Sequence, residues 1–97
     1  MPAEQTCHMY IVRCSDGSLY VGSTEDVAGR VRTHNTARGP MFTRIRLPVK
    51  FVYSEPFATM ADARQREIQI KKWSRAKKEA LINGHRAALK RLSRRRT

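Results

Sequence analysis

The sequence predicts a small α+β domain in which helices flank a three-stranded antiparallel sheet, in the order β-β-α-β-α-α. With 97 residues the chain is long enough for one compact domain. Three short segments, 8–14, 19–22 and 49–53, are rich in strand-forming residues. The longer segments between and after them place apolar residues at helical spacing and begin with capping residues. Together these observations exclude an all-helical and an all-strand fold.

The first two strands form a β-hairpin. The segment 15–18 between them reads Ser-Asp-Gly-Ser, which is turn chemistry. Side chains alternate between the two faces of a strand, so Tyr10 and Tyr20 each occupy one defined face of the sheet. The register of the hairpin decides whether the two faces are the same.

A helix over 26–37 follows the hairpin. Ser23 and Asp26 have the spacing of a capping box, and Gly39 with Pro40 ends the helix. At the helical spacing of three and four, the core-facing stripe consists of Val27, Arg30, Val31 and His34. Half of this stripe is polar, and such exceptions tend to mark functional sites.

The segment 38–47 is predicted to be a basic loop beside the end of that helix, and phosphate contact is the use that its arginines suggest. The third strand, 49–53, is bounded by Pro48 and Pro56, which keeps proline out of its middle.

The next helix begins at a capping box formed by Thr59 and Asp62 and reaches about Trp73. Its apolar stripe contains Met60, Ala63 and Ile70, and Glu67 falls within that stripe at helical spacing. A solvated glutamate would lie on the other face, so Glu67 is a candidate site residue.

Ser74 caps a further helix over 75–83, and Gly84 ends it. The segment 85–97 is expected to form a short helix that frays into an arginine-rich tail. The predicted organisation is therefore a domain over 7–84 followed by a basic helix and tail over 85–97.

The net positive charge of the chain indicates what kind of partner it binds. Twenty Lys and Arg residues against 8 acidic residues give a formal net charge of +12, which favours a polyanion, with nucleic acid ahead of an anionic membrane surface. No apolar run approaches the roughly 20 residues that span a bilayer, and 1–6 lacks the features of a signal peptide. A soluble, cytoplasmic protein is expected.

Cys7 and Cys14 are expected to be reduced thiols, with no structural metal.

The order of these residues resembles the GIY-YIG nuclease family. Met9-Tyr10-Ile11, with Met in place of glycine, and Tyr20-Val21-Gly22 are similar to the two defining tripeptides. The segment 26–35, which contains Arg30 and His34, resembles the first-helix signature, and 63–73, which contains Glu67, resembles the metal-binding helix. The resemblance covers about 7–83, and the length is most similar to that of small stand-alone bacterial members.

The resemblance implies a metal-dependent endonuclease that hydrolyses DNA phosphodiester bonds and leaves 5′-phosphate and 3′-hydroxyl ends. Single-stranded or branched DNA in repair or recombination is a possible substrate, and the enzyme would work in the bacterial cytoplasm, associated with the nucleoid while acting. No small-molecule cofactor is expected, and DNA is favoured over RNA as the partner.

The residue types supply what this chemistry needs. Glu67 can hold a hydrated Mg²⁺ or Mn²⁺, because such ions often need only one protein carboxylate, and Arg30 can bind nonbridging phosphate oxygens at any working pH. Tyr10 can orient or deprotonate the attacking water, His34 can relay a proton or hydrogen-bond Tyr10, and Tyr20 can support the water network. Gly22 is assigned as a structural turn. The nucleic-acid-binding candidates are Arg32, Arg38, Arg44, Arg46, Lys71 and Lys72.

Each residue also has an ordinary interpretation when it is taken alone. A strand tyrosine usually serves packing, and Glu67 can pair with Lys71 four residues on. The alternative function is a noncatalytic nucleic-acid-binding module on the same fold, which the missing glycine of the first tripeptide motivates. A basic membrane-surface protein is the third hypothesis, and the lack of a helix with a broad apolar face weighs against it.

Overall fold

The computed structural model describes residues 6–84, and its sheet has three antiparallel strands in the spatial order β2-β1-β3. The central strand is β1 (Cys7–Arg13), and the two edge strands are β2 (Leu19–Thr24) and β3 (Lys50–Phe57). The predicted fold class is confirmed. The helix and tail expected over 85–97 lie outside the described residues.

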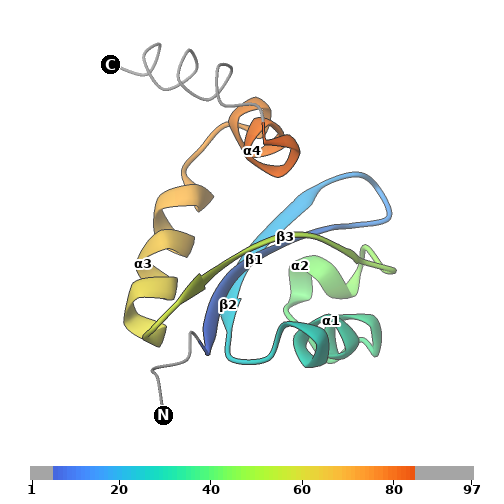
Figure 1. The fold of residues 1–97 in the computed structure, drawn as a ribbon. Helices are drawn as coiled ribbons and strands as arrows, with labels where there is room; N and C mark the ends of the chain where they lie inside the picture. Colours follow the sequence, from blue (N-terminus) through green and yellow to red (C-terminus); the bar gives the residue numbers. More distant parts are fainter. Residues whose placement is uncertain (1–5, 85–97) are drawn as a thin grey trace.

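Four helices complete the domain: α1 (Val27–Asn35), α2 (Met41–Arg44), α3 (Met60–Lys71) and α4 (Arg75–Asn83). Figure 1 shows α1 and α2 together on one side of the sheet and α3 on the other, with α4 following α3. The sheet is therefore the middle of three layers.

Each face of the sheet has its own core. The face towards α3 and α4 buries Met9, Ile11 and Val21 with Ile70 and Leu81. The opposite face, towards α1 and α2, buries a second cluster that consists of Tyr10, Val12, Cys14 and Val49, with Tyr20, Val31 and Leu47 packed against it. Alternation along β1 separates the two clusters, as the period of two predicts.

Hairpin register settles the faces of the two tyrosines. Tyr10 pairs with Gly22, and Val12 pairs with Tyr20. Paired residues point to the same face, so both tyrosines lie on the face that α1 and α2 cover.

The start of α1 differs from the prediction. Ser23 is not its cap, because β2 continues to Thr24 and pairs Ser23 with Met9. Asp26 is the N-cap, and its side chain accepts a hydrogen bond from the backbone N–H of Gly29. The helix ends at Asn35, two residues before the predicted end.

Two further boundaries differ. β3 runs through Pro56 to Phe57, which is possible because an edge strand leaves one side of its backbone unpaired. The segment 38–47, expected to be a loop throughout, contains the one-turn helix α2 with Pro40 as its N-cap. A helix of four residues is too short to show periodicity in the sequence.

Both later helices begin and end close to the predicted residues. Thr59 and Ser74 accept hydrogen bonds from Asp62 and Lys77 backbone N–H groups, as N-caps do. Gly84 ends α4 with a φ of 71°, the left-handed conformation that favours glycine at this position. Cys7 and Cys14 are free and buried, as expected.

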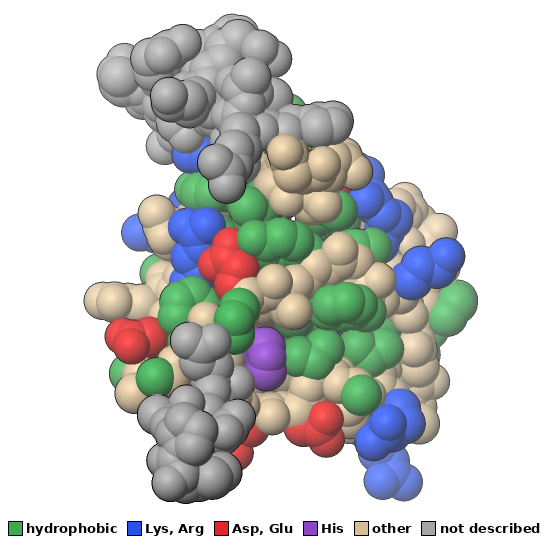
Figure 2. All heavy atoms as spheres, viewed as in Figure 1, with side chains coloured by type: hydrophobic (Ala, Val, Ile, Leu, Met, Phe, Trp, Pro, Cys, Tyr) green, Lys and Arg blue, Asp and Glu red, His purple; other side chains and the backbone are tan. Residues whose placement is uncertain are grey.

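The surface is mixed on the face seen in Figure 1. Figure 2 shows apolar side chains across the middle of this face, with Lys and Arg side chains towards its margins. None of the helices within residues 6–84 combines the length and apolar character that crossing a bilayer requires.

Candidate active site

A pocket of about 360 Å³ lies at the β2 edge of the sheet, and four elements contribute to it. Strand β1 supplies Tyr10, and helix α1 supplies Arg30. Strand β2 and helix α3 supply the rest of the lining, which is Tyr20, Gly22, Ser23, Arg64, Glu67 and Ile68. The structure thus brings Tyr10, Tyr20, Gly22, Arg30 and Glu67 together from positions far apart in the sequence.

This pocket reaches both faces of the sheet because β2 is an edge strand. Tyr20 and Gly22 point towards the α1 face, whereas Ser23, one residue on, points towards α3. The hydroxyl of Ser23 donates a hydrogen bond to the Glu67 carboxylate. Groups from opposite faces of the sheet therefore meet around its edge.

Gly22 lies within β2, not in a turn, and its missing side chain makes room for Tyr10. A Cβ atom at this position would lie 2.6 Å from the Tyr10 hydroxyl oxygen and 2.7 Å from Cζ of the same ring. Any larger residue would displace the phenol. Gly22 therefore sets the position of Tyr10 instead of permitting a tight turn.

A directed chain of hydrogen bonds holds the Tyr10 hydroxyl. The Thr43 hydroxyl donates to the carbonyl of Pro40 at 3.1 Å, so its oxygen accepts from Nδ1 of His34 at 2.8 Å. Nε2 of His34 is then the unprotonated nitrogen, and it accepts from the Tyr10 hydroxyl at 2.9 Å. The predicted contact between His34 and Tyr10 is present, and Thr43 selects the tautomer that forms it.

Burial keeps both members of this pair neutral. Tyr10 is 1% exposed and His34 is fully buried. Burial raises the pKa of Tyr10 above its ordinary value of 10.0, and the nearby Tyr20 adds to the rise. Burial lowers the pKa of His34 below 6.5, and the Arg30 guanidinium lowers it further. At neutral pH the phenol therefore donates and the imidazole accepts.

Glu67 lies within the buried stripe of α3, as predicted. Ala63 and Ile70 on the same stripe are fully buried, and the side chain of Glu67 is 15% exposed. One carboxylate oxygen accepts from Ser23, and the other lies 2.8 Å from Nζ of Lys71. The contact with Lys71 that the sequence allowed is formed.

The donor set around Glu67 suits a hard divalent cation. A carboxylate and a hydroxyl oxygen adjoin the pocket, and Mg²⁺ or Mn²⁺ would complete its coordination with waters. Among the described residues no cluster of three or more metal-binding side chains occurs. Lys71, with its side chain 47% exposed, forms an ion pair with the carboxylate.

Arg30 is exposed, contrary to its expected place in the inward stripe of α1. Its side chain joins the pocket to a second, open groove of about 710 Å³ that runs along α1. Threonines and two predicted nucleic-acid-binding residues, Arg32 and Arg38, line this groove. Arg30 therefore lies at the junction of the pocket and the groove along α1.

The ring of Tyr20 contacts two other rings and the ammonium group of a lysine. Its centroid lies 5.3 Å from that of His34 in an edge contact and 6.1 Å from that of Phe42 in a stacked contact. Nζ of Lys71 lies 5.5 Å from the same ring. Tyr20 thus packs between His34, which belongs to the hydrogen-bond chain of Tyr10, and Phe42 of helix α2.

The remaining predicted basic residues are distributed over the surface. Arg44 and Arg46 belong to α2 and the turn after it, and Arg46 pairs with Asp16 at 3.1 Å. Lys72 lines a different groove, of about 770 Å³, beside Trp73. The structure does not bring Lys72 into the candidate site.

Three residues of the site escaped the prediction. Ser23 was assigned to a helix cap, and Thr43 lay in a segment assigned to a loop. Nothing in the sequence therefore marked either residue as part of the site. Arg64 lines the pocket and lies three residues before Glu67, so the helical spacing of three was a usable signal. Its guanidinium adds a second positive charge to the lining, beside that of Arg30.

Comparisons with known proteins identify the family of the chain. The family model described as the GIY-YIG catalytic domain matches residues 6–80. A UPF0213 protein of Bacillus pumilus is 45% identical over 75 residues, which cover 77% of this chain and 76% of that protein. A UPF0213 protein of Staphylococcus saprophyticus is 47% identical over 76 residues, covering 78% of this chain and 93% of that protein.

Two solved structures have the same fold. The solution NMR structure of the UPF0213 protein BH0048 of Bacillus halodurans is 37% identical with a TM-score of 0.53, covering 81% of this chain and 84% of that one. The solution NMR structure of the protein EF2693 of E. faecalis is 30% identical with a TM-score of 0.57, covering 90% and 93%. The chain belongs to the GIY-YIG family, a family of nucleases, as its tripeptides suggested.

The residue that departs from the first tripeptide lies outside the pocket. Met9, which stands where the family motif has glycine, is fully buried in the core on the α3 face with Ile11 and Ile70. Its neighbour Tyr10 points to the other face and lines the pocket. Met9 therefore belongs to the core on the α3 face and is not part of the pocket lining.

Proposed function

We propose that this protein is a metal-dependent endonuclease that hydrolyses DNA phosphodiester bonds at the pocket on the β2 edge. The observation that carries the proposal is the convergence of Tyr10, Tyr20, Arg30 and Glu67 on one open pocket. These groups match the requirements of phosphodiester hydrolysis, which are an oriented water, neutralisation of phosphate charge and stabilisation of the leaving oxygen.

Glu67, assisted by the Ser23 hydroxyl, would hold Mg²⁺ or Mn²⁺, and the bound ion would supply Lewis-acid stabilisation of charge on the phosphate and the leaving oxygen. Arg30 binds a nonbridging phosphate oxygen and remains charged throughout the reaction. Arg64, which lines the same pocket, is placed to neutralise a second oxygen.

Tyr10 orients the nucleophile. Its proton is committed to Nε2 of His34, so the lone pairs of the phenol oxygen are left to accept a hydrogen bond from the attacking water. A pKa raised by burial keeps the phenol protonated. A proton taken from water would have to pass on to His34, whose lowered pKa disfavours the imidazolium. Orientation is therefore the main role of Tyr10, and a transient relay through His34 is the secondary one.

The test is cleavage by a Glu67→Ala variant. Labelled single-stranded, duplex and branched DNA would be incubated with the protein in Mg²⁺, in Mn²⁺ or in EDTA, and the products would be resolved on a denaturing gel. Wild type should give metal-dependent products with 5′-phosphate ends, and Glu67→Ala should give none while it still binds DNA. Glu55→Gln, which removes a half-buried carboxylate paired with Arg66 away from the pocket, is the matched control and should cleave normally.

Two results would contradict the proposal. Equal cleavage by wild type and Glu67→Ala would remove Glu67 from the chemistry. Salt-sensitive binding by wild type without metal-dependent products would favour the alternative, a noncatalytic nucleic-acid-binding module on this fold.

A further inference from the structure

Lys71 is among the nucleic-acid-binding residues predicted from the sequence, yet it contacts the carboxylate that is proposed to hold the metal. Its Nζ lies 2.8 Å from Oε2 of Glu67, and the hydroxyl of Ser23 donates to the other oxygen, Oε1. Both oxygens of the carboxylate are therefore engaged. Pairs of residues four apart on a helix surface are usually exposed at both ends, whereas the side chain of Glu67 is only 15% exposed and lines the pocket.

A divalent cation and the Lys71 ammonium compete for the same oxygen of Glu67. Two positive groups beside one carboxylate repel each other, so Lys71 has to leave Oε2 when a cation coordinates there. The side chain of Lys71 is 47% exposed, and little packing opposes this change. The ring of Tyr20 lies within reach, because its centroid is 5.5 Å from Nζ of Lys71, a distance at which a cation–π contact is favourable.

Once it has left Glu67, Lys71 has no other acidic partner among the described residues, because its ion pair there is with Glu67 alone. A further cation, Lys78 of α4, lies near it. Burial lowers the pKa of Lys78, and the charge of Lys71 lowers it further, so an anion would relieve the repulsion between the two lysines. Tyr20 lines the pocket that also contains Arg30, and the anion expected in that pocket is a phosphate of the substrate strand.

We infer that Lys71 couples metal binding to substrate binding: it pairs with Glu67 until a divalent cation binds the carboxylate, and it then pairs with a phosphate of the bound strand. This role of Lys71 rests on the proposed nuclease function and regulates the occupancy of its metal site. Thermodynamic linkage makes the coupling reciprocal. A bound strand that draws Lys71 away from Glu67 therefore raises the affinity for the metal by the factor by which the metal raises the affinity for the strand.

The test measures Mn²⁺ binding, which does not depend on cleavage. Free Mn²⁺ is quantified from its electron paramagnetic resonance signal while the full chain is titrated in the absence of DNA. Lys71→Met removes the ammonium and keeps an unbranched side chain. This variant should bind Mn²⁺ about fivefold more tightly than wild type, because a partly exposed ion pair that no longer competes contributes up to about that factor. Lys71→Arg, which keeps a charge that can pair with Glu67, should bind Mn²⁺ as wild type does.

Lys72→Met is the matched control. It removes the same charge from the next residue, which is exposed and lines the groove beside Trp73 instead of the pocket, and it should leave the Mn²⁺ affinity unchanged. The comparison separates the contact with Glu67 from the long-range effect of a lost charge. Circular dichroism would verify that each variant is folded.

A second titration, with a saturating single-stranded oligonucleotide, measures the coupling itself. It uses chains that also carry Tyr10→Phe, which removes the hydroxyl proposed to orient the water and so preserves the oligonucleotide, while Glu67 stays in place. The oligonucleotide should raise the Mn²⁺ affinity of the chain that contains Lys71. The same gain should be about fivefold smaller in Lys71→Met, because the ion pair that the strand disrupts is already absent. Lys72→Met should show the full gain.

Equal Mn²⁺ affinities of Lys71→Met and Lys72→Met without DNA would overturn the inference, and so would equal gains on adding the oligonucleotide. Weaker Mn²⁺ binding by Lys71→Met would overturn it as well, because the lysine would then support the carboxylate as a metal ligand. Each of these results is compatible with metal-dependent cleavage by wild type, so the nuclease would stand. Mn²⁺ binding that Glu67→Ala leaves unchanged would contradict the metal site and the coupling together. Tighter binding by Lys71→Met with no cleavage products from wild type would contradict the nuclease alone.

Discussion

At the scale of single residues, the position of Tyr10 depends on three neighbouring residues. Gly22 leaves space for its ring, His34 accepts its proton and Thr43 fixes the tautomer of His34. Gly39 contributes in the same way, because a Cβ atom there would lie 2.8 Å from Nδ1 of His34. Rigid support of this kind holds a catalytic group within the narrow geometry that it needs.

The buried His34 predicts how stability changes with pH. Its folded-state pKa is lowered from the ordinary value of 6.5 by burial and by Arg30. Below about pH 6.5 the imidazole of His34 therefore binds a proton in the unfolded chain but not yet in the folded chain. The free energy of unfolding consequently falls as the pH drops from 6.5 towards the folded-state pKa. The slope is at most about 1.4 kcal/mol per pH unit. Above pH 6.5 this group contributes no pH dependence.

Urea unfolding of wild type and His34→Gln across the range from about pH 7.5 to 5 measures this effect. The variant should be less stable overall but should lose the slope below pH 6.5. Glu55 and Glu79 provide an internal comparison. Burial raises the pKa of Glu55, but its hydrogen bonds from Arg66 and Tyr53 together outweigh burial and lower that pKa from 4.5. The hydrogen bond from Arg13 is the main cause that lowers the pKa of Glu79 from 4.5. Their contribution is present above pH 4.5 and is lost only at lower pH. A variant that retained the wild-type slope near pH 6 would contradict the assignment.

At the scale of elements, the sequence was informative wherever a side chain contacts the backbone of its own segment. Thr59 and Ser74 cap the helices that they were predicted to cap, because a capping interaction is local. Ser23 was wrong as a cap because its partner, Glu67, lies 44 residues away, and no local pattern reports such a contact. Arg30 lines the candidate pocket, but its side chain is exposed, because helical spacing predicts the direction of a side chain and not how deeply it is buried.

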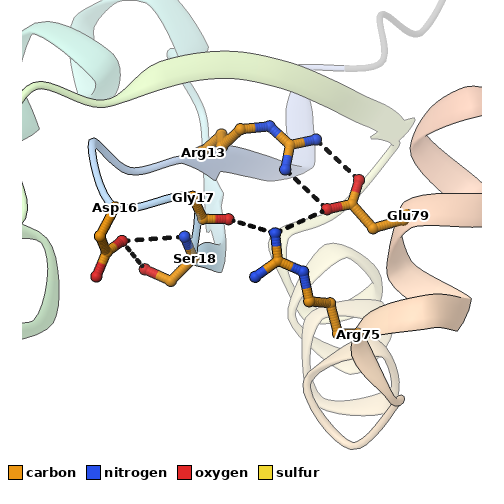
Figure 3. A network of polar contacts seen from close by, with 6 residues as sticks. All are labelled: Arg13, Asp16, Gly17, Ser18, Arg75 and Glu79. Carbon is orange, nitrogen blue, oxygen red and sulfur yellow. Dashed lines mark hydrogen bonds and ion pairs between the residues drawn. The ribbon is translucent and has the colours of Figure 1, made fainter.

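Helix α4 is joined to the β1–β2 hairpin by a polar network (Figure 3). Arg13 donates to both carboxylate oxygens of Glu79, at 2.7 and 2.8 Å, and Arg75 donates to the carbonyl of Gly17 at 2.7 Å. The Arg13 and Glu79 side chains are 33% and 26% exposed, so solvent weakens the pair. Its two parallel bonds still favour one docking geometry for α4.

Glu79→Ala should therefore lower the free energy of unfolding by about 1 kcal/mol, at the upper end for partly exposed ion pairs, and leave DNA cleavage unchanged. Chemical unfolding and the gel assay together measure this. A double-mutant cycle with Arg13→Ala separates the pair from its surroundings. Additive effects of the two substitutions would show that the pair contributes nothing, whereas reduced cleavage would mean that α4 supports the active site.

At the scale of the whole molecule, the candidate active site lies at an edge of the sheet. Strand β2 is paired on one side only, so groups from the α1 face and the α3 face meet around it. The sequence predicted three antiparallel strands but not their spatial order, which depends on how β3 returns to β1. The family resemblance pointed to residues that line one pocket in the structure, whereas their separation onto opposite faces became evident only from the register.

Basic charge on one side of this edge predicts how binding responds to salt. Arg30, Arg32 and Arg38 line the groove that leaves the pocket, and each cation that neutralises a phosphate of a single strand changes the slope of log K against log salt by about 0.7. Arg38→Ala should therefore weaken binding of single-stranded DNA and make the slope shallower by about that amount. Fluorescence titrations at several salt concentrations, in the Glu67→Gln background, measure both quantities. Lys50→Ala removes an exposed cation on the opposite edge strand; it is the matched control and should leave the slope unchanged. Equal slopes for wild type and Arg38→Ala would place the DNA backbone outside the α1 groove, and an altered slope for Lys50→Ala would place it at the β3 edge.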